Sequence, residues 1–395
     1  MSPRHTIQCS AVLALLGSAV AIPASAATLT VGPGQTYTTP CKAFAVAKAG
    51  DTINITGNTT YRGDVCAIKQ HKLTIRGVNG RPKIDAGGKN ALGKGTWVVQ
   101  GNDIVIENVE MFGSKVPDRN GAALRLEGTN FTLRKAFIHD NENGILSGVN
   151  TASKIVIENS EFGHNGNGTG QTHNLYIGNA GSLVFRFNYS HDAHVGHNLK
   201  SRARINTIAY NRFSSTVPGQ AGTTAVGKPS YEIDLPNAGT AYIIGNVIHQ
   251  PLAHSNSNLV AYGAEGPTNP TQDLYVVNNT FLNDDSARGT FVLIGTKVTK
   301  KALLQNNIFS GTGTVTNQVG AVEKTNYRSV APGFVNRAAL DLRPTANALV
   351  VNAGSAPPTV NGMSLKPAYV YQHSASAATR PVVKTIDVGA YESAL

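Results

Sequence analysis

Acidic residues and long apolar runs are scarce in this sequence. Asp and Glu together number 23 against 34 Lys and Arg, only 14% of the residues are charged, and the formal net charge is +11. No apolar run after residue 26 is long enough to span a bilayer, so we expect no membrane insertion. The excess of basic residues favours an anionic partner, unless the charge serves only solubility.

Cysteine is almost absent, with three in the whole chain. Cys9 lies in an N-terminal segment that has Arg4, an apolar run over 11–22 and a small-residue cleavage pattern at 24–26. These features are typical of an export signal, so residues 1–26 are predicted to be removed and the mature protein to be secreted or periplasmic. In an oxidising compartment the remaining Cys41 and Cys66 most simply form a disulfide, the alternative being two separate buried thiols.

Repetition is what the sequence has in abundance. One series of short alternating segments recurs with a period of about 24–35 residues, which is typical of a solenoid, at 72–76, 103–107, 130–134, 154–158, 182–186, 206–210, 240–244, 273–277 and 301–305. A second series interleaves with the first, at 123–128, 144–148, 174–178, 198–202, 231–235, 258–263 and 290–295. Two or three strands per coil are therefore expected, with Asn at the corners, where it tolerates a left-handed backbone and stacks into ladders.

The repeats predict an all-β, single-domain, right-handed parallel β-helix over residues 27–395. Its regular coils are expected over about 51–310, behind a short capping helix at 40–49. Residues 311–395 form an irregular C-terminal tail in this interpretation, with a final strand at 387–392. We expect a monomer.

The segments 31–35 (VGPGQ), 50–53 (GDTI), 73–77 (LTIRG) and 81–85 (RPKID), with the ending 387–392 (DVGAYE), resemble the first and last coils of exported bacterial polysaccharide lyases of the right-handed parallel β-helix type. Lys200 and Arg202, two residues apart, are similar to the Lys and Arg that alginate and chondroitin lyases of this type use on neighbouring coils. The resemblance implies a lyase acting on an acidic polysaccharide, although the fold also carries hydrolases, epimerases, esterases and phage adhesins.

Chemically active side chains gather in residues 173–234, where four of the eleven histidines fall within 25 residues. Alignment of the second series places Arg125, Leu146, Tyr176 and Lys200 in one outward row on successive coils, which stack at about 4.8 Å. Period-two alternation brings Arg202 to the same face. His173 and His197 each precede an Asn-Leu strand start and should stack, while Glu232 and Asp234 should share an outward face across Ile233, all of these positions being read from the same alignment.

Cleavage of a uronic-acid polymer by β-elimination needs a group that neutralises the carboxylate, a base and an acid. We assign Lys200 as the base, because a neighbouring Arg should depress its pKa, and Arg202 as the carboxylate ligand. Tyr176 or His197 is the acid or a second base. Four further residues are predicted to bind substrate, namely His173, His194, Arg125 and Tyr231, and Glu232 with Asp234 are candidate Ca²⁺ ligands.

Other functions fit the same residues. A glycoside hydrolase would use Glu232 and Asp234 with Asp192, an epimerase would share the proton abstraction, and a binding module would cleave nothing. Lys200 and Arg202 would then be partners in ordinary ion pairs across coils, the histidines would be corner residues bonded to backbone, and Tyr176 would be a platform for sugar rings. A transition-metal set from His191, Asp192, His194 and His197 matches no standard ligand spacing.

Overall fold

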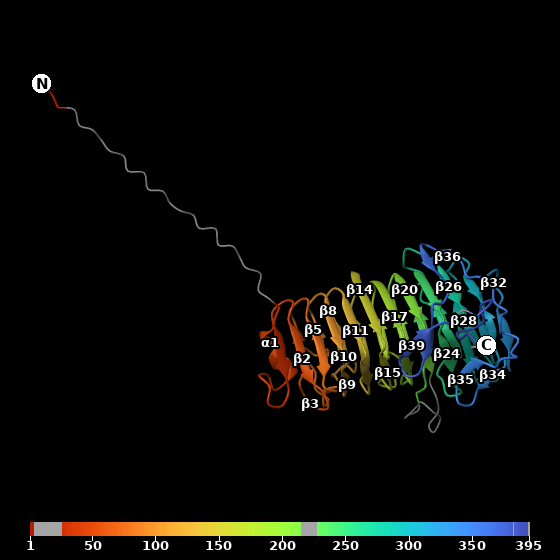
Figure 1. Cartoon of the computed structure of the whole chain (residues 1–395), viewed down its shortest axis with the longest axis horizontal. Coiled ribbons are helices and arrows are strands. Elements are labelled where there is room, and N and C mark those ends of the chain that lie inside the picture. Colours follow the sequence, from red (N-terminus) through yellow and green to blue (C-terminus); the bar gives the residue numbers. More distant parts are fainter. Residues whose placement is uncertain (4–25, 215–226, 382, 394–395) are drawn as a thin grey trace.

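The computed structural model describes residues 1–3, 26–214, 227–381 and 383–393. The predicted export signal lies almost entirely outside these residues. The chain winds into a solenoid whose coils follow one another from the N-terminal to the C-terminal end (Figure 1), and each regular coil contributes one strand to each of three long parallel sheets. The predicted parallel β-helix is therefore confirmed, with three strands per coil.

Sheet A corresponds to the first predicted series and contains β1 (Thr28–Val31), β2 (Thr52–Thr56), β5 (Thr74–Val78), β8 (Ile104–Glu107), β11 (Phe131–Arg134), β14 (Asn150–Glu158), β17 (Ala180–Arg186), β20 (Ile205–Ala209), β23 (Thr240–Ile244), β26 (Leu274–Val277), β29 (Leu303–Gln305) and β32 (Val322–Lys324). Sheet C corresponds to the second and contains β4 (Cys66–Ile68), β7 (Gly95–Val99), β10 (Ala122–Leu126), β13 (Asn143–Ser147), β16 (Leu175–Ile177), β19 (Leu199–Ser201), β22 (Ile233–Leu235), β25 (Asn258–Tyr262), β28 (Thr290–Ile294) and β31 (Thr314–Thr316).

Sheet B follows sheet A in each coil after a sharp turn. Its strands are mostly only three residues long, which is why the sequence shows them as short apolar pairs behind a polar pair. They are β3 (Thr60–Arg62), β6 (Lys83–Asp85), β9 (Glu110–Phe112), β12 (Phe137–His139), β15 (Glu161–Gly163), β18 (Tyr189–His191), β21 (Arg212–Ser214), β24 (Val247–Gln250), β27 (Thr280–Asn283), β30 (Ile308–Ser310) and β33 (Tyr327–Ser329).

The core is the inside of the solenoid, filled by the alternate apolar residues of each strand. In sheet A one inward row is in register over eight coils and fully buried, comprising Ile106, Leu133, Ile157, Phe185, Ile208, Ile243, Val276 and Leu304. Because neighbouring coils bury each other's apolar faces, each coil is stabilised by the coils on either side of it. The same register fixes which outward side chains become neighbours.

Asparagine ladders hold the turn between sheets A and B, as predicted. The Nδ2 of each Asn donates to the Oδ1 of its counterpart on the next coil, along Asn188, Asn211, Asn246, Asn279, Asn307 and Asn326. The residue before a ladder Asn often has a positive φ, as in Asn278 (53°) and Asn306 (57°). Asn suits this conformation because its short polar side chain bonds locally.

The N-terminal end is closed by helix α1 (Pro40–Val46), whose Phe44 packs edge-on against Trp97 at 5.2 Å between ring centroids. The predicted disulfide between Cys41 and Cys66 is confirmed and ties this helix to β4. None of the helices within the described residues has both the length and the apolar character needed to cross a membrane.

The C-terminal tail packs against the outside of the last coils. The parallel ladders run beyond residue 310, to β33, and three antiparallel hairpins follow: β34 (Phe334–Asn336) with β35 (Asp341–Pro344), β36 (Thr359–Val360) with β37 (Met363–Ser364), and β38 (Tyr369–Gln372) with β39 (Ser376–Thr379). The tail buries outward residues of sheet B such as Val247 and Leu282.

The final strand predicted at 387–392 is wrong, since no strand forms there. Val388 and Ala390 do point into apolar surroundings, which explains the alternating pattern. Their partners are the outer surfaces of β24, β27 and β30, and the backbone accepts hydrogen bonds from the Asn278 side chain instead of joining a ladder.

Candidate functional site

Sheet C carries the predicted row of outward side chains. Its register pairs Arg125 with Leu146, Leu146 with Tyr176, Tyr176 with Lys200, and Lys200 with Asp234. The alignment of the second series is therefore confirmed, and it places three polar side chains on three successive coils. Arg125 is separated from Tyr176 by the coil of Leu146, and its charge helps to lower the pKa of Glu127 against the effect of burial.

Lys200 is held by two carboxylates. Its Nζ lies 3.1 Å from Oδ2 of Asp234 and donates to Oε1 of Glu265 at 2.7 Å. The ammonium group also lies 5.6 Å from the centre of the Tyr176 ring. With only 8% of the residue exposed, these contacts replace most of its hydration.

Arg202 follows the end of β19 and faces the same point. Its Nε donates to the hydroxyl oxygen of Tyr176 at 2.8 Å, and its Nη2 donates to Oε2 of Glu265 at 2.5 Å. Its Nη1 donates to Oδ1 of Asn237. One Glu265 carboxylate thus bridges the two cations, and the predicted association of Tyr176, Lys200 and Arg202 is confirmed.

The charge state of Lys200 differs from the expectation. Burial alone would lower the pKa of the Lys200 ammonium, but the carboxylates of Asp234 and Glu265 outweigh burial and raise it. The prediction of a depressed pKa was wrong, because it weighed only the neighbouring Arg202 and left out Asp234 on the next coil and Glu265, which reaches Lys200 from a distant loop. Burial raises the pKa of Asp234 to about 6 even though Lys200 opposes the shift. Above that pH the site contains two cations and two anions.

The histidines stack as predicted, with the His173 and His197 rings 4.6 Å apart and nearly parallel. Nδ1 of His173 accepts the backbone N–H of His197, and Nδ1 of His197 accepts that of Tyr231. Burial, reinforced by Lys200, lowers the pKa of His173 to about 3, and burial lowers that of His197 well below its usual value. Both rings are therefore neutral and carry their proton on Nε2.

His197 still has access to the site. Its Nε2 lies 3.5 Å from Oδ2 of Asp234, and the Tyr231 ring packs beside it at 5.1 Å between centroids. A neutral imidazole with its proton on Nε2 is a hydrogen-bond donor and not a cationic acid. Tyr231 is half-buried at the edge of this group, and its predicted contact with substrate stays a prediction.

Glu232 does not share a face with Asp234, contrary to the prediction. The backbone bends at Glu232 before β22 begins, and the side chain turns inward, where it is fully buried. It ends a second ladder along Asn165, Asn174 and Asn198, and its Oε2 accepts Nδ2 of Asn198 at 2.5 Å. Burial raises the pKa of Glu232 to about 8, against the hydrogen bond from Asn198.

This position of Glu232 has consequences for two predictions. A carboxylic acid inside the solenoid cannot face a sugar ring together with Asp234, so the predicted pair of hydrolytic carboxylates is not formed. The two groups also do not converge on a common point where Ca²⁺ could bind, since Asp234 faces Lys200. The Ca²⁺ requirement itself stays a prediction.

Other histidines lie at the corner between sheets B and C. His164, His191 and Asp192 have ligand atoms within 4.8 Å of one another, a group that could hold a metal ion. His191 Nδ1 already contacts Asp192 Oδ2 at 2.7 Å. His194 is exposed in the turn, and its ring lies beside the loop around Gly168. Within the described residues it makes no contact with the row that contains Lys200.

Sequence reasoning missed Glu265 and Asn237, which complete the cation pair. Both lie in loops just after strands of sheet C, Asn237 after β22 and Glu265 after β25. Arg202 occupies the corresponding place after β19, so the loops that leave sheet C on successive coils meet at one edge. Extending the strand alignment past the strand ends would have brought these three residues together.

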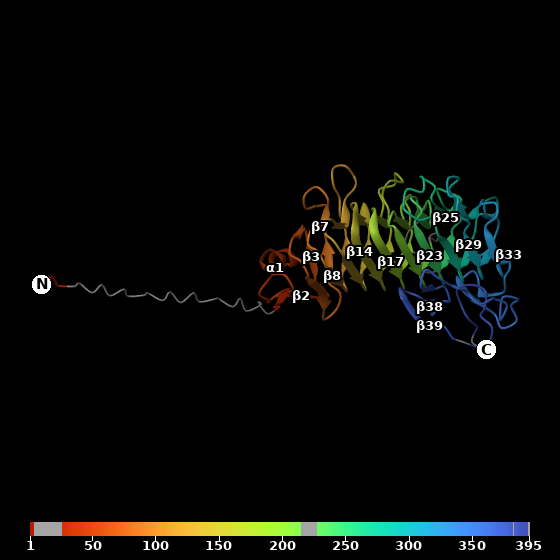
Figure 2. The same cartoon turned by 90° about the horizontal axis from the view of Figure 1, so that it is seen from above.

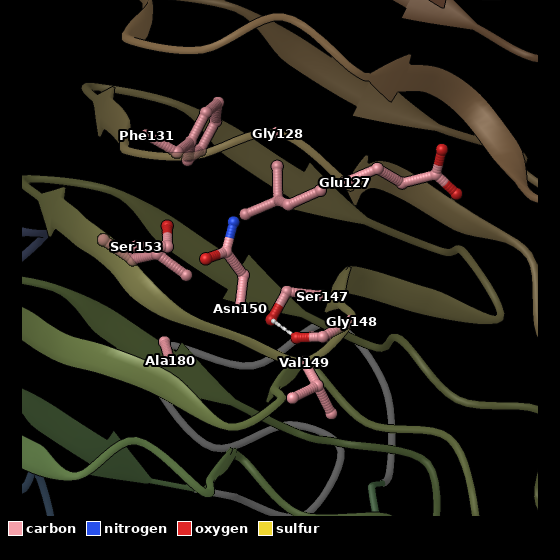
Figure 3. Close-up of a pocket in the computed structure, with 11 residues that line it drawn as sticks. Glu127, Gly128, Phe131, Ser147, Gly148, Val149, Asn150, Ser153 and Ala180 are labelled. Atoms are coloured by element: carbon pink, nitrogen blue, oxygen red, sulfur yellow. Dashed lines mark hydrogen bonds between the residues drawn. The ribbon is translucent and has the colours of Figure 1, made fainter.

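Two hollows lie near this row. A small one of about 30 Å³, at the outer corner between sheets C and A, is lined by Glu127, Ser147 and Asn150 (Figure 3). It has room for water and not for a sugar ring. A larger cleft of about 380 Å³ is lined by Arg119, Asn167 and Thr172, the last being the residue before His173.

Comparison with a solved structure supports the fold. Neither a protein family nor a curated protein matches the sequence. Among solved structures, pectate lyase Pel9A superposes with a TM-score of 0.63 at 15% identity, over 93% of this chain and 96% of that chain. Further matches include a PL6 alginate lyase in complex with a trisaccharide (TM-score 0.39, 12% identity, 88% of this chain and 96% of that chain) and pectin methylesterase PemA from Erwinia chrysanthemi (0.33, 11%, 81% and 98%).

The similarity to Pel9A shows a right-handed parallel β-helix of the kind found in polysaccharide lyases. The resemblance read from the opening and closing coils is therefore confirmed at the level of the fold. Because this fold serves many different functions, the activity depends on the residues of the site.

Proposed function

We propose that the protein is an exported, secreted or periplasmic carbohydrate-active enzyme, and specifically a lyase that cleaves a uronic-acid polysaccharide by β-elimination. One observation carries this proposal: a single carboxylate, that of Glu265, bridges the Lys200 ammonium and the Arg202 guanidinium beside the Tyr176 hydroxyl. Two cations arranged around one carboxylate are what a lyase needs to neutralise a uronate.

In the proposed reaction the substrate carboxylate takes the place of Glu265. Lys200 and Arg202 neutralise it and stabilise the negative charge that develops when the C5 proton leaves. The Tyr176 hydroxyl lies against Arg202 and is the group placed to exchange protons with the sugar. Tyr176, as a phenolate beside the Arg202 guanidinium, takes the C5 proton, and the C5–H electrons form the C4–C5 double bond as the C4–O4 bond breaks. The Tyr176 hydroxyl then returns that proton to O4.

The role of Lys200 in this proposal is to supply charge, in place of the base predicted from the sequence. A lysine whose pKa is raised stays protonated at neutral pH and cannot accept a proton. The Glu265 side chain is about half exposed, so its carboxylate can move away from the two cations without disturbing the core.

The test is to incubate the mature protein with alginate, polygalacturonate, glucuronan and glycosaminoglycans, each with and without Ca²⁺. We expect one of them to yield products that absorb in the ultraviolet, because only β-elimination leaves an unsaturated uronate. New reducing ends without that absorbance would replace the lyase by a hydrolase. Binding without any product would replace it by a non-catalytic module.

Glu265→Gln should tighten the binding of the cleaved polymer. The variant removes the anion that competes with substrate for Lys200 and Arg202, so we expect KM to fall by about threefold to tenfold at low salt, with kcat changed less. Steady-state kinetics at two ionic strengths measure this, and the gain should shrink at high salt. Asp118→Gln is the matched control, since this exposed acidic residue lies on the cleft lined by Arg119 and makes no ion pair within the described residues. A raised KM in Glu265→Gln, with the control unchanged, would mean that Glu265 binds substrate itself.

A further inference from the structure

A third hollow lies on sheet B, beneath the C-terminal tail. It is a groove of about 720 Å³ between β21 and the tail hairpins, lined among others by Arg212, Leu340, Arg343, Tyr371, His373 and Tyr391. Its volume is in the range of small-molecule binding sites. Hairpin β38–β39 lies on the side of the solenoid opposite to the loops beside β7 and β25 (Figure 2), so the groove is separate from the outer face of sheet C.

Arg212 is the unusual residue of this groove. It begins β21 on the outward row of sheet B, between Tyr189 and Val247, where the tail starts to cover the sheet. Only 9% of the residue is exposed, and its Nε is buried without a hydrogen-bond partner. Its guanidinium carbon lies 5.7 Å from the centre of the Tyr189 ring, the one cation–π contact that Arg212 makes within the described residues. Over the described residues it forms no ion pair.

The acidic residues around the groove are already paired with other cations. Asp341 bonds Arg343 at 2.6 Å, and Glu392 bonds the buried Arg380 at 2.8 Å. Residues 215–226, which follow β21, include no Asp or Glu. Arg212 therefore leaves the groove with one positive charge that no described carboxylate neutralises.

A buried charge without a partner is costly, so a guanidinium in such a place normally has an anion beside it. We propose that the groove is a second, non-catalytic binding site for a carboxylate-bearing sugar, anchored by Arg212. The planar guanidinium matches a carboxylate in a bidentate manner. Tyr391, which is half-buried at the groove, supplies aromatic surface on which a sugar ring can pack. The choice of a sugar acid as ligand rests on the proposed function, whereas the anion site does not.

The experiment measures binding of sodium glucuronate by calorimetry to protein carrying both Lys200→Met and Arg202→Met, so that neither cation of the sheet C site contributes. Adding Arg212→Met should lower the association constant at least about tenfold, which is the effect of losing one charged hydrogen-bonding partner. Arg328→Met, which alters an exposed arginine of β33 outside the groove, should leave binding unchanged. Glucose should bind far more weakly than glucuronate, and inorganic phosphate should not match glucuronate.

Thermal unfolding without ligand provides the second readout. Because Arg212 has no ion-pair partner to lose within the described residues, the melting temperature of Arg212→Met should be equal to or above that of its parent. Removal of an arginine that had a structural partner would lower the melting temperature instead. Glucuronate should raise the melting temperature of the parent and not of the variant. Arg212→Gln serves the same purpose if the methionine variant misfolds.

The proposal is overturned if glucuronate binds Arg212→Met as tightly as the parent, if the parent shows no saturable binding, or if phosphate binds equally well. These results are read without turnover. If the wild-type protein forms no unsaturated product, the proposed lyase activity is rejected. The binding measured at Arg212 is a separate result and stands or falls by itself.

Discussion

Lys200→Met should lower turnover of the cleaved polysaccharide by about 10²–10⁴-fold, the range for loss of a group that stabilises or transfers charge in the transition state. The ammonium group is the innermost cation of the site, 3.1 Å from Asp234 and 2.7 Å from Glu265, and methionine keeps its length without its charge. The measurement is the initial rate of ultraviolet absorbance at saturating polymer.

Two companion variants show what Lys200 does. Lys200→Arg should retain a substantial part of the rate if the residue supplies charge, and should be as inactive as Lys200→Met if it is a base. Lys154→Met is the matched control, because this exposed lysine lies on β14 in sheet A, away from the row. Full activity of Lys200→Met, on a polymer that the wild type cleaves, would remove the site from the reaction.

Glu232→Gln should stabilise the protein at neutral pH, and increasingly so as the pH rises. The carboxyl has a pKa of about 8 when folded against 4.5 in its ordinary environment. Below pH 4.5 the folded and unfolded chains both hold the proton, so the group costs nothing there. Between pH 4.5 and about 8 only the folded chain holds it, and stability is lost as pH rises. At pH 7 the loss is on the order of 3 kcal/mol, which the amide removes.

Denaturant unfolding of the wild type and Glu232→Gln at pH 5, 7 and 8.5 measures this difference, because the amide can still accept the hydrogen bond from Asn198. Glu158→Gln is a control of opposite sign. Burial would raise the pKa of Glu158, but hydrogen bonds from Arg134 and Arg186 outweigh it and lower the pKa. That variant should therefore be less stable than the wild type at pH 7 and approach it in acid. Parallel pH profiles for the wild type and Glu232→Gln would mean that the carboxyl is ionised in the folded protein.

The strand alignment explains why much of the site could be predicted. Parallel coils stack in register, so residues at equivalent places in the repeat become neighbours. This rule alone placed Tyr176 beside Lys200, extended the row from Arg125, and stacked His173 on His197. The disulfide between Cys41 and Cys66 was predicted separately, from the export signal and the number of cysteines, and is confirmed.

The same rule failed where the backbone leaves the strand. Glu232 was assigned by alternation to the face of Asp234, although the chain bends there and the side chain takes the place that Asn174 and Asn198 occupy on earlier coils. Comparing the residue that precedes each strand of sheet C would have shown that Glu232 stands at the position of the ladder asparagines. The pKa of Lys200 was misjudged for a related reason, since Glu265 reaches it from a loop 65 residues away.

The sequence by itself determined the solenoid, its register and the outward row, because these depend on a repeat in which local alternation and stacking agree. Only the tertiary structure decided the charge state of the site, the burial of Glu232 and the groove around Arg212. Those features depend on loops and on a tail that do not repeat, and whose contacts join residues far apart in the chain. Burial and charge pairing are set by everything that surrounds a group, and no periodic pattern records that.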